Sequence, residues 1–127
     1  MDGLFERFEF NGKAECDIDK INGVTLPADY IELMRDHDGG EGDVGENAYI
    51  QIFRLSELQD INDEYQISEY IKDYFVWGTD LGGMLFGYSG GTGMYSAVDA
   101  CSLCEDDLMC VSDSLCGFIG SFDRSLG

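Results

Sequence analysis

Four cysteines in the C-terminal third of the chain have the chemistry to bind a metal. Cys101 and Cys104 are separated by two residues, and Cys110 and Cys116 follow. Four thiolates satisfy a tetrahedral zinc ion, but paired zinc knuckles place two residues inside each cysteine pair, and the second pair here encloses five. The spacing alone therefore leaves metal binding by these four cysteines open.

The surroundings of these cysteines favour a packing role. Cys110 alternates with Met109 and Val111 in an apolar run, and Cys116 lies on the apolar stripe of a predicted helix. A free cysteine behaves as a small buried hydrophobe. The acidic residues after Cys104 would disfavour a thiolate and so weaken redox chemistry. We expect core cysteines, with no bound metal and no cofactor.

An acidic, glycine-containing stretch over residues 36–47 suggests a calcium loop. Such a loop needs oxygen ligands at its positions 1, 3, 5 and 12 and glycine at position 6. Counted from Asp36, these requirements fail at Gly40, Glu41 and Asn47. The stretch is more typical of a helix end followed by a solvated acidic loop over residues 38–47.

Two further patterns suggest chemistry and fail on context. The glycines at 87, 90, 91 and 93 could cradle a phosphate, but no lysine follows, and the run lies between two predicted strands instead of opening a helix. We expect a hairpin turn there. His37 is the single histidine, and no serine or cysteine has a recognisable base near it in sequence. The chain is therefore not expected to be an enzyme.

Net charge is the most informative property of the whole composition. Seven Lys and Arg oppose 26 Asp and Glu, which gives −19. Such a field repels nucleic acids and anionic membrane surfaces, whereas it attracts a basic protein surface. A general solubility charge remains the alternative explanation. The 44% apolar content argues for a folded domain despite the charge.

The clearest element is a helix over residues 27–37. Pro27 suits the first turn of a helix, where its missing N–H is not needed. Tyr30, Leu33 and Met34 recur at helical spacing and form one apolar stripe. Two glycines at 39 and 40 end the helix.

The rest of the chain alternates short strands with further helices. A strand is predicted over residues 49–53, and Ser56 with Gln59 forms a capping-box pattern that opens a second helix. Ser112 or Asp113 could cap a last helix that carries Phe118 and Phe122. Further elements are expected at 68–72 (helix) and at 74–79, 84–89, 94–101 and 108–111 (strands), with turns between them.

Together these elements predict an α+β fold, with an antiparallel sheet of about five to six strands flanked by helices in a single domain over residues 1–127. Residues 1–16 have no clear pattern. The N-terminus lacks a secretory signal, and no apolar run is long enough to cross a membrane. We therefore expect a cytoplasmic protein with reduced thiols.

The order of short motifs resembles the SUKH superfamily, whose founding members include a yeast regulator of cell-wall synthesis. The likeness covers about residues 17–122 and rests on Leu26, Pro27, Tyr30, Gly39, Gly40, Trp77, Gly78 and Asp80, then on Gly82-Gly83 and Phe86-Gly87-Tyr88. The resemblance implies an antiparallel sheet with helices packed against it. Bacterial members are mostly immunity proteins that neutralise a toxin by binding it. The N-terminal helix that is usual in this group is eroded here, since residues 3–15 are broken by Asn11-Gly12.

This resemblance and the charge predict an immunity protein that binds a cognate, basic toxin domain and does not bind nucleic acid or membrane directly. The oligomeric state stays open. Two acidic patches are the candidate contact residues: Asp36, Asp38, Glu41, Asp43 and Glu46, and Asp60, Asp63 and Glu64. Tyr49, Tyr65 and Tyr70 are candidate aromatic anchors. A regulatory interaction scaffold and an acidic nucleic-acid mimic remain the alternatives.

Overall fold

A curved seven-stranded antiparallel sheet organises the chain. We describe it from a computed structural model, which describes residues 4–127. In sheet order the strands are β1 (Phe8–Phe10), β4 (Gly40–Val44), β5 (Ala48–Ile52), β6 (Tyr74–Thr79), β7 (Met84–Ser89), β8 (Met94–Asp99) and β9 (Met109–Ser112). A separate two-stranded hairpin consists of β2 (Lys20–Ile21) and β3 (Val24–Thr25). The predicted α+β class and antiparallel sheet are confirmed, with more strands than expected.

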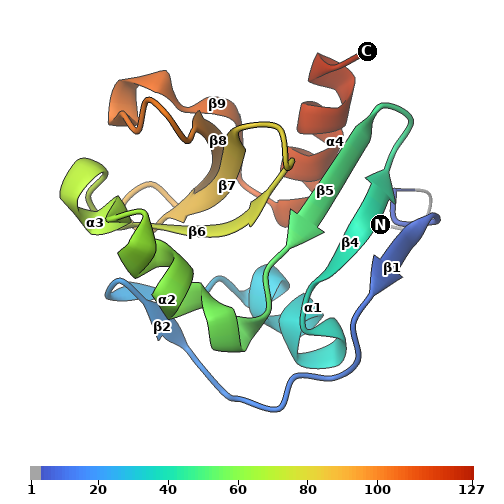
Figure 1. Ribbon diagram of the computed structural model, residues 1–127, viewed down its shortest axis with the longest axis horizontal. Helices are drawn as coiled ribbons and strands as arrows, with labels where there is room; N and C mark the ends of the chain where they lie inside the picture. The colour runs from blue at the N-terminus through green and yellow to red at the C-terminus, as the bar shows by residue number, and fades with distance from the viewer. Residues whose placement is uncertain (1–3) are drawn as a thin grey trace.

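Helices lie around both ends of this sheet (Figure 1). They are α1 (Ala28–His37), α2 (Leu55–Glu64), α3 (Ile67–Tyr70) and α4 (Leu115–Ser125), with a short 3-10 turn η1 (Glu105–Asp107). In Figure 1, α1, α2 and the β2–β3 hairpin are at the lower end of the sheet and α4 is at the upper end. No helix among residues 4–127 is long and apolar enough to span a membrane.

The predicted helices exist, but their first residues differ from the predictions. Pro27 is the N-cap residue of α1, so it precedes the first turn and does not lie within it. Helix α2 begins at Leu55, so the capping residue is Arg54 and not Ser56, and the backbone N–H of Arg54 donates to Glu57 Oε1 at 3.2 Å. Ser114 caps α4, because its hydroxyl accepts the Gly117 N–H at 3.0 Å. Each shift moves a helix start by one or two residues.

The largest error of the sequence analysis is the predicted loop over residues 38–47. Five of its residues form β4, which pairs with β1 on one side and β5 on the other. Gly40 and Gly42 read as turn residues in isolation. In the sheet they allow β1 to approach closely, because a Cβ at Gly40 would collide with the Glu9 carbonyl and the Phe8 ring. The segment over residues 3–15 holds β1 in place of a helix; residues 1–3 lie outside the described part.

One face of the sheet packs against α1 and α4 around Trp77, which is fully buried. The Trp77 ring lies 6.1 Å from Tyr30 of α1 and 5.7 Å from Phe118 of α4, measured between ring centroids. Phe86 of β7 lies 4.8 Å from Phe122. Aromatic packing of this kind fixes both helices to the same face and makes it the main core.

The opposite face is covered only in part, by α2 and α3. Buried Asn62 of α2 donates to the Val76 carbonyl at 2.9 Å and accepts the Val76 N–H at 2.7 Å. The side chain thus takes the place of a neighbouring strand along that stretch of β6. Pairing between β5 and β6 is accordingly short, with only Gln51–Thr79 and Ile52–Gly78 opposed. The sheet opens at this point, and α2 stands beside the opening.

The cysteines are less buried than predicted. Cys101 is exposed, whereas Cys104, Cys110 and Cys116 are half-buried at the edge of the core. The prediction of a core role is therefore wrong for Cys101, because it follows the end of β8 in a surface turn. Within residues 4–127, no three Cys, His, Asp or Glu side chains are grouped closely enough to hold a metal ion.

Candidate interaction surface

The register of the sheet places one row of side chains on the partly covered face. Glu9 of β1 lies opposite Glu41 of β4, which in turn lies opposite Gln51 of β5. Gln51 lies opposite Thr79 of β6. Directly opposed residues of antiparallel strands share a face, so the row crosses four strands without interruption. It begins with carboxylates at the sheet edge and ends beside α2.

Three exposed carboxylates gather at the outer end of this row. We call Glu9, Glu41, Asp43 and the neighbouring Tyr49 the acidic strand surface. Tyr49 donates its hydroxyl to Glu41 Oε2 at 2.7 Å, and this hydrogen bond raises the pKa of the Tyr49 hydroxyl. Like charges directly opposite one another destabilise a sheet, and Glu9 faces Glu41 in this way. Neither of the two ion pairs found among residues 4–127 involves these carboxylates.

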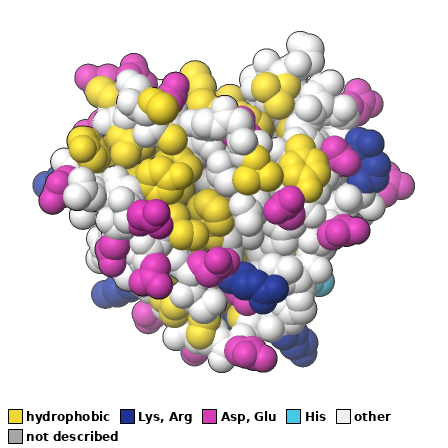
Figure 2. All heavy atoms as spheres, in the orientation of Figure 1, with side chains coloured by type: hydrophobic (Ala, Val, Ile, Leu, Met, Phe, Trp, Pro, Cys, Tyr) yellow, Lys and Arg dark blue, Asp and Glu magenta, His cyan; other side chains and the backbone are white. Residues whose placement is uncertain are grey.

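A groove adjoins the acidic strand surface, between α2 and strands β5–β7. We call it the α2 groove; its volume is about 390 Å³, and it is lined by Gln51, Phe53, Ile61, Glu64, Tyr65, Thr79, Leu81, Gly83, Leu85 and Ala100. No Lys or Arg lines it. Figure 2 shows hydrophobic side chains gathered on this side of the molecule, with acidic side chains around them. Gln51 also lines the next hollow, together with Glu9, Glu41 and Glu57, so the groove and the acidic strand surface are continuous. Arg54 lines this second hollow too, where it is paired with Asp38.

Leu81 stands at the lip of this groove in an unusual backbone conformation. Its φ is 62°, in the left-handed region that costs a leucine about 1 kcal/mol or more. The side chain is 56% exposed, so burial within this chain offsets little of that cost. Across the groove, Tyr65 is 40% exposed. Two large apolar side chains therefore face solvent at one hollow.

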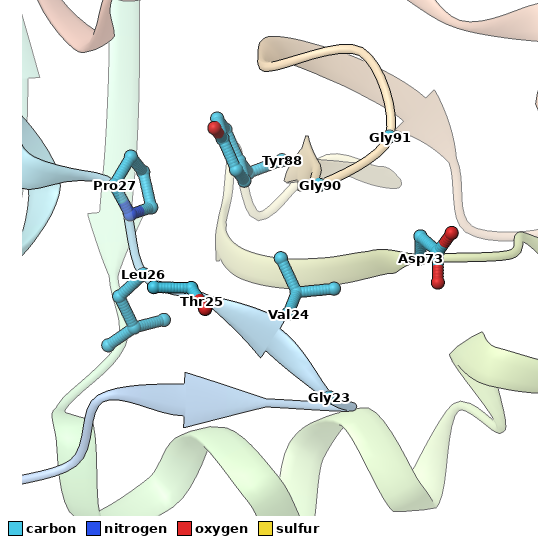
Figure 3. A pocket seen from close by; sticks show the side chains of 9 residues that line it. All are labelled: Gly23, Val24, Thr25, Leu26, Pro27, Asp73, Tyr88, Gly90 and Gly91. Carbon is cyan, nitrogen blue, oxygen red and sulfur yellow. The ribbon is translucent and has the colours of Figure 1, made fainter.

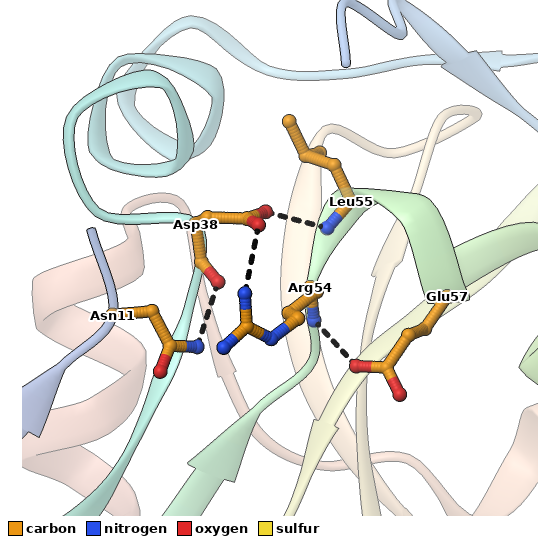
Figure 4. Close-up of polar contacts among 5 residues, drawn as sticks. All are labelled: Asn11, Asp38, Arg54, Leu55 and Glu57. Carbon is orange, nitrogen blue, oxygen red and sulfur yellow. Dashed lines mark hydrogen bonds and ion pairs between the residues drawn. The ribbon is translucent and has the colours of Figure 1, made fainter. Parts of the chain in front are cut away.

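Asp38, predicted as a contact residue, is only 6% exposed (Figure 4). Its Oδ1 accepts the backbone N–H of Leu55 at 2.9 Å, and its Oδ2 lies 3.6 Å from Arg54 Nη1. Its backbone carbonyl accepts a hydrogen bond from Asn11 Nδ2 at 3.0 Å. The N–H groups in the first turn of a helix have no acceptor within that helix, and Asp38 supplies the acceptor for the N–H of Leu55. We therefore remove Asp38 from the contact surface and assign it a structural role.

The other predicted acids of both patches are exposed. Glu41 and Asp43 lie on β4, Glu64 lines the α2 groove, and Asp36 and Glu46 lie on the last turn of α1 and the β4–β5 turn; Asp60 and Asp63 lie on α2. The three tyrosines proposed as anchors, Tyr49, Tyr65 and Tyr70, are all exposed. Sequence reasoning missed Glu9 and Leu81. An apolar residue between Asp80 and two glycines was the available signal for Leu81.

The β4–β5 turn is held from two sides. Buried Asp123 of α4 accepts backbone N–H groups from Glu46, Asn47 and Ala48 at 3.2, 2.6 and 3.0 Å. On the other side, Arg7 donates to the Gly45 carbonyl at 2.7 Å, and the Gly45 N–H donates to the Leu4 carbonyl at 3.0 Å. These bonds fix the turn that carries the acidic strand surface.

Comparison with known families decides the relationship of this chain. A sequence model of the SMI1 / KNR4 family (SUKH-1) matches residues 17–117. The chain belongs to this family. The resemblance drawn from its motifs is thereby confirmed. A search of curated proteins found no match.

The SUKH-1 match covers the α2 groove but only part of the acidic strand surface. Residues 17–117 contain the whole α2 groove together with Glu41 and Asp43. Glu9 on one side and Asp123 on the other lie outside the matched range. The groove therefore lies within the matched part of the chain, whereas the edge of the acidic strand surface is not covered by the match.

A second hollow on this SUKH-1 domain has a different character (Figure 3). It has a volume of about 430 Å³ and is lined by Gly23, Val24, Thr25, Leu26, Pro27, Asp73, Tyr88, Gly90 and Gly91. Asp73 is its single carboxylate, and no Lys, Arg or His lines it. Its polar side chains are Thr25, Asp73 and Tyr88, so it differs from the α2 groove, which Ile61, Leu81 and Leu85 line.

Proposed function

We propose that this SUKH-1 protein is an immunity protein, which acts in the cytoplasm and neutralises a basic protein toxin by binding it one-to-one. It performs no catalysis and needs no cofactor. Family membership supports a protein-binding role, and the acidic strand surface supports a basic partner. A toxin that cleaves nucleic acid has a cationic cleft for phosphates, and an acidic protein surface is complementary to such a cleft.

One observation carries the proposal. Glu9 and Glu41 face each other across two paired strands, and no ion pair of the described residues neutralises either one. This arrangement weakens the free protein, since like charges repel across a sheet. A cationic partner would remove the repulsion on binding. A solubility charge alone does not require that two carboxylates be placed opposite each other.

Co-expression with the C-terminal domain of the protein encoded immediately upstream tests this proposal. We expect growth rescue, and one-to-one binding that survives a rise in salt. The double variant Glu41→Lys, Asp43→Lys should lose rescue. A matched control, Asp106→Lys with Asp107→Lys, makes the same charge change next to β9, at the opposite edge of the sheet, and should retain rescue.

Three results would contradict the proposal. A neighbour that is not toxic, or is toxic and not neutralised, removes the immunity role for that pair and favours a regulatory scaffold. Loss of rescue in both double variants assigns the effect to total charge and not to the acidic strand surface. Binding to many basic proteins that disappears with salt favours a nucleic-acid mimic, because salt screens exposed charges.

A further inference from the structure

The β6–β7 turn is stiff and presents Leu81 outward. Asp80 Oδ1 accepts the N–H groups of Gly82 at 2.7 Å and Met84 at 3.0 Å. Thr79 Oγ1 accepts the Leu81 N–H at 3.1 Å and donates to the Met84 carbonyl at 2.7 Å. Four hydrogen bonds thus fix five residues, and none of them uses the Leu81 side chain. The turn holds this side chain in place without burying it.

The residue type at position 81 is costly for the free protein. At a φ of 62° a glycine or asparagine adopts the required backbone with less strain. Two glycines follow at 82 and 83, so glycine is accepted elsewhere in this turn. A leucine that is 56% exposed contributes little to the core. Backbone strain at an exposed apolar side chain indicates a use outside the chain's own packing.

That use is defined by the groove beside it. Leu81 shares the α2 groove with Ile61 and Tyr65 of the helix and with Leu85 in the sheet. Its volume of about 390 Å³ is near the lower end of the range of roughly 300–1,000 Å³ for ligand sites. Large apolar anchors inserted into such hollows carry most of the energy of protein interfaces. The groove suits one or two side chains of a partner.

The charges around the groove define what flanks that anchor. Glu64 is in its wall, and Gln51 leads directly to Glu41 and Glu9. No Lys or Arg lines the groove. A second copy of this chain would bring another charge of −19 to the same place, which opposes self-association. The complementary occupant is a basic segment.

We propose that the α2 groove receives a large apolar side chain of the partner, flanked by Lys or Arg, and that Leu81 and Tyr65 clamp it. The identity of the partner as a toxin rests on the proposed function. The chemistry of the segment rests on the groove and on the carboxylates beside it. The inference adds to the acidic strand surface an apolar contact, which salt does not screen.

Two synthetic peptides test the groove without any toxin. One has a central leucine flanked by lysines, and the other has serine in place of that leucine. Backbone amide NMR signals of Gln51, Tyr65 and Thr79 should shift with the leucine peptide. With the serine peptide, only signals of the acidic strand surface should move. Identical shifts with both peptides would overturn the inference, since they would report charge attraction alone.

The variant Leu81→Gly then separates binding from folding. We expect its thermal midpoint to equal or exceed that of the wild type, while the leucine-peptide shifts fall at least several-fold. Asp73→Gly is the matched control, because Asp73 also has a positive φ, of 54°, and lines the other hollow. It should leave the peptide shifts unchanged. Unchanged shifts in Leu81→Gly would contradict the clamp.

The same variant distinguishes the two proposals in the toxin assay. If Leu81→Gly neutralises the upstream-encoded domain as well as the wild type does, the groove inference is overturned and the immunity role stands. Leucine-dependent peptide binding without neutralisation of that domain overturns the immunity role for that pair and supports the groove. Association of the free chain that depends on Leu81, measured by light scattering, would assign the groove to self-association instead.

Discussion

Asp123 Oδ1 lies 2.6 Å from the backbone nitrogen of Asn47, 76 positions earlier in the chain. The same carboxylate also accepts the N–H groups of Glu46 and Ala48. One buried side chain of α4 thus saturates three backbone donors of the β4–β5 turn. The position of the acidic strand surface relative to the core depends on it.

Replacement of Asp123 by asparagine should lower the free energy of unfolding by about 2–3 kcal/mol. An amide has one acceptor oxygen where the carboxylate has two, and its NH₂ group would face N–H donors. Urea titration near neutral pH measures the loss. Arg124→Ala, at the exposed neighbouring position, should cost less than about 0.5 kcal/mol. Equal costs for the two variants would contradict the role assigned to Asp123.

The same contact predicts how acid acts on the protein. Burial alone would raise the pKa of Asp123, but the three backbone N–H donors, with a smaller contribution from the charge of Arg124, outweigh it and hold the pKa below its ordinary value of 3.8. Stabilisation from a lowered pKa is complete above the ordinary value and is lost as the pH falls through the folded-state value. The stability gap between wild type and Asp123→Asn should therefore be constant near neutral pH and close below about pH 4. A gap that persists in stronger acid would contradict this assignment.

The loss of stability caused by three substitutions around α2 should depend on which polar groups each one leaves unpaired. Asp38→Ala removes the acceptor of the Leu55 N–H and should cost about 1–2 kcal/mol, like the loss of a helix cap. Asp38→Asn keeps one acceptor and should cost less. Arg54→Ala breaks an ion pair of 3.6 Å on a half-exposed side chain and should cost below about 1 kcal/mol. Denaturant midpoints measure the order; a cost for Arg54→Ala equal to that of Asp38→Ala would contradict it.

Glu9→Lys should stabilise the free protein by roughly 0.2–1 kcal/mol, because it replaces a repulsive cross-strand pair with an attractive one opposite Glu41. The gain should shrink as salt is added. Glu6→Lys is the control: it makes the same charge change in the same segment, outside β1. If Glu6→Lys stabilises the protein equally, the effect comes from net charge. The partner should associate more slowly with Glu9→Lys than with the control.

Much of the fold follows from patterns that are local in sequence. Helix α1 was predicted because Tyr30, Leu33 and Met34 form one stripe, and all three are buried. Strands β6, β7 and β8 were predicted because apolar runs alternate with glycine turns. The bounds of β6 and β7 are as expected, whereas β8 ends at Asp99, two residues before its predicted end. In these segments the residues that define the element also pack it against its neighbours.

The missed features depend on contacts between distant segments. Strand β4 has two glycines and two acids, and only pairing with β1 and β5 on both sides makes it a strand. Asp38 resembles a surface acid until α2 begins beside it and needs an acceptor for the Leu55 N–H. No spacing rule relates either feature to its partner. Which candidate acids share a strand was accordingly not predictable from the sequence.

Hydrogen bonds hold the β4–β5 turn to Arg7 and Leu4 near one end of the chain and to Asp123 near the other. All three of these residues lie outside residues 17–117, the part that matches the family. Substitutions at these three positions would move the turn that carries the acidic strand surface. The geometry of the acidic strand surface therefore depends on residues that the family match does not cover, although Glu41, Asp43 and Tyr49 themselves lie within it.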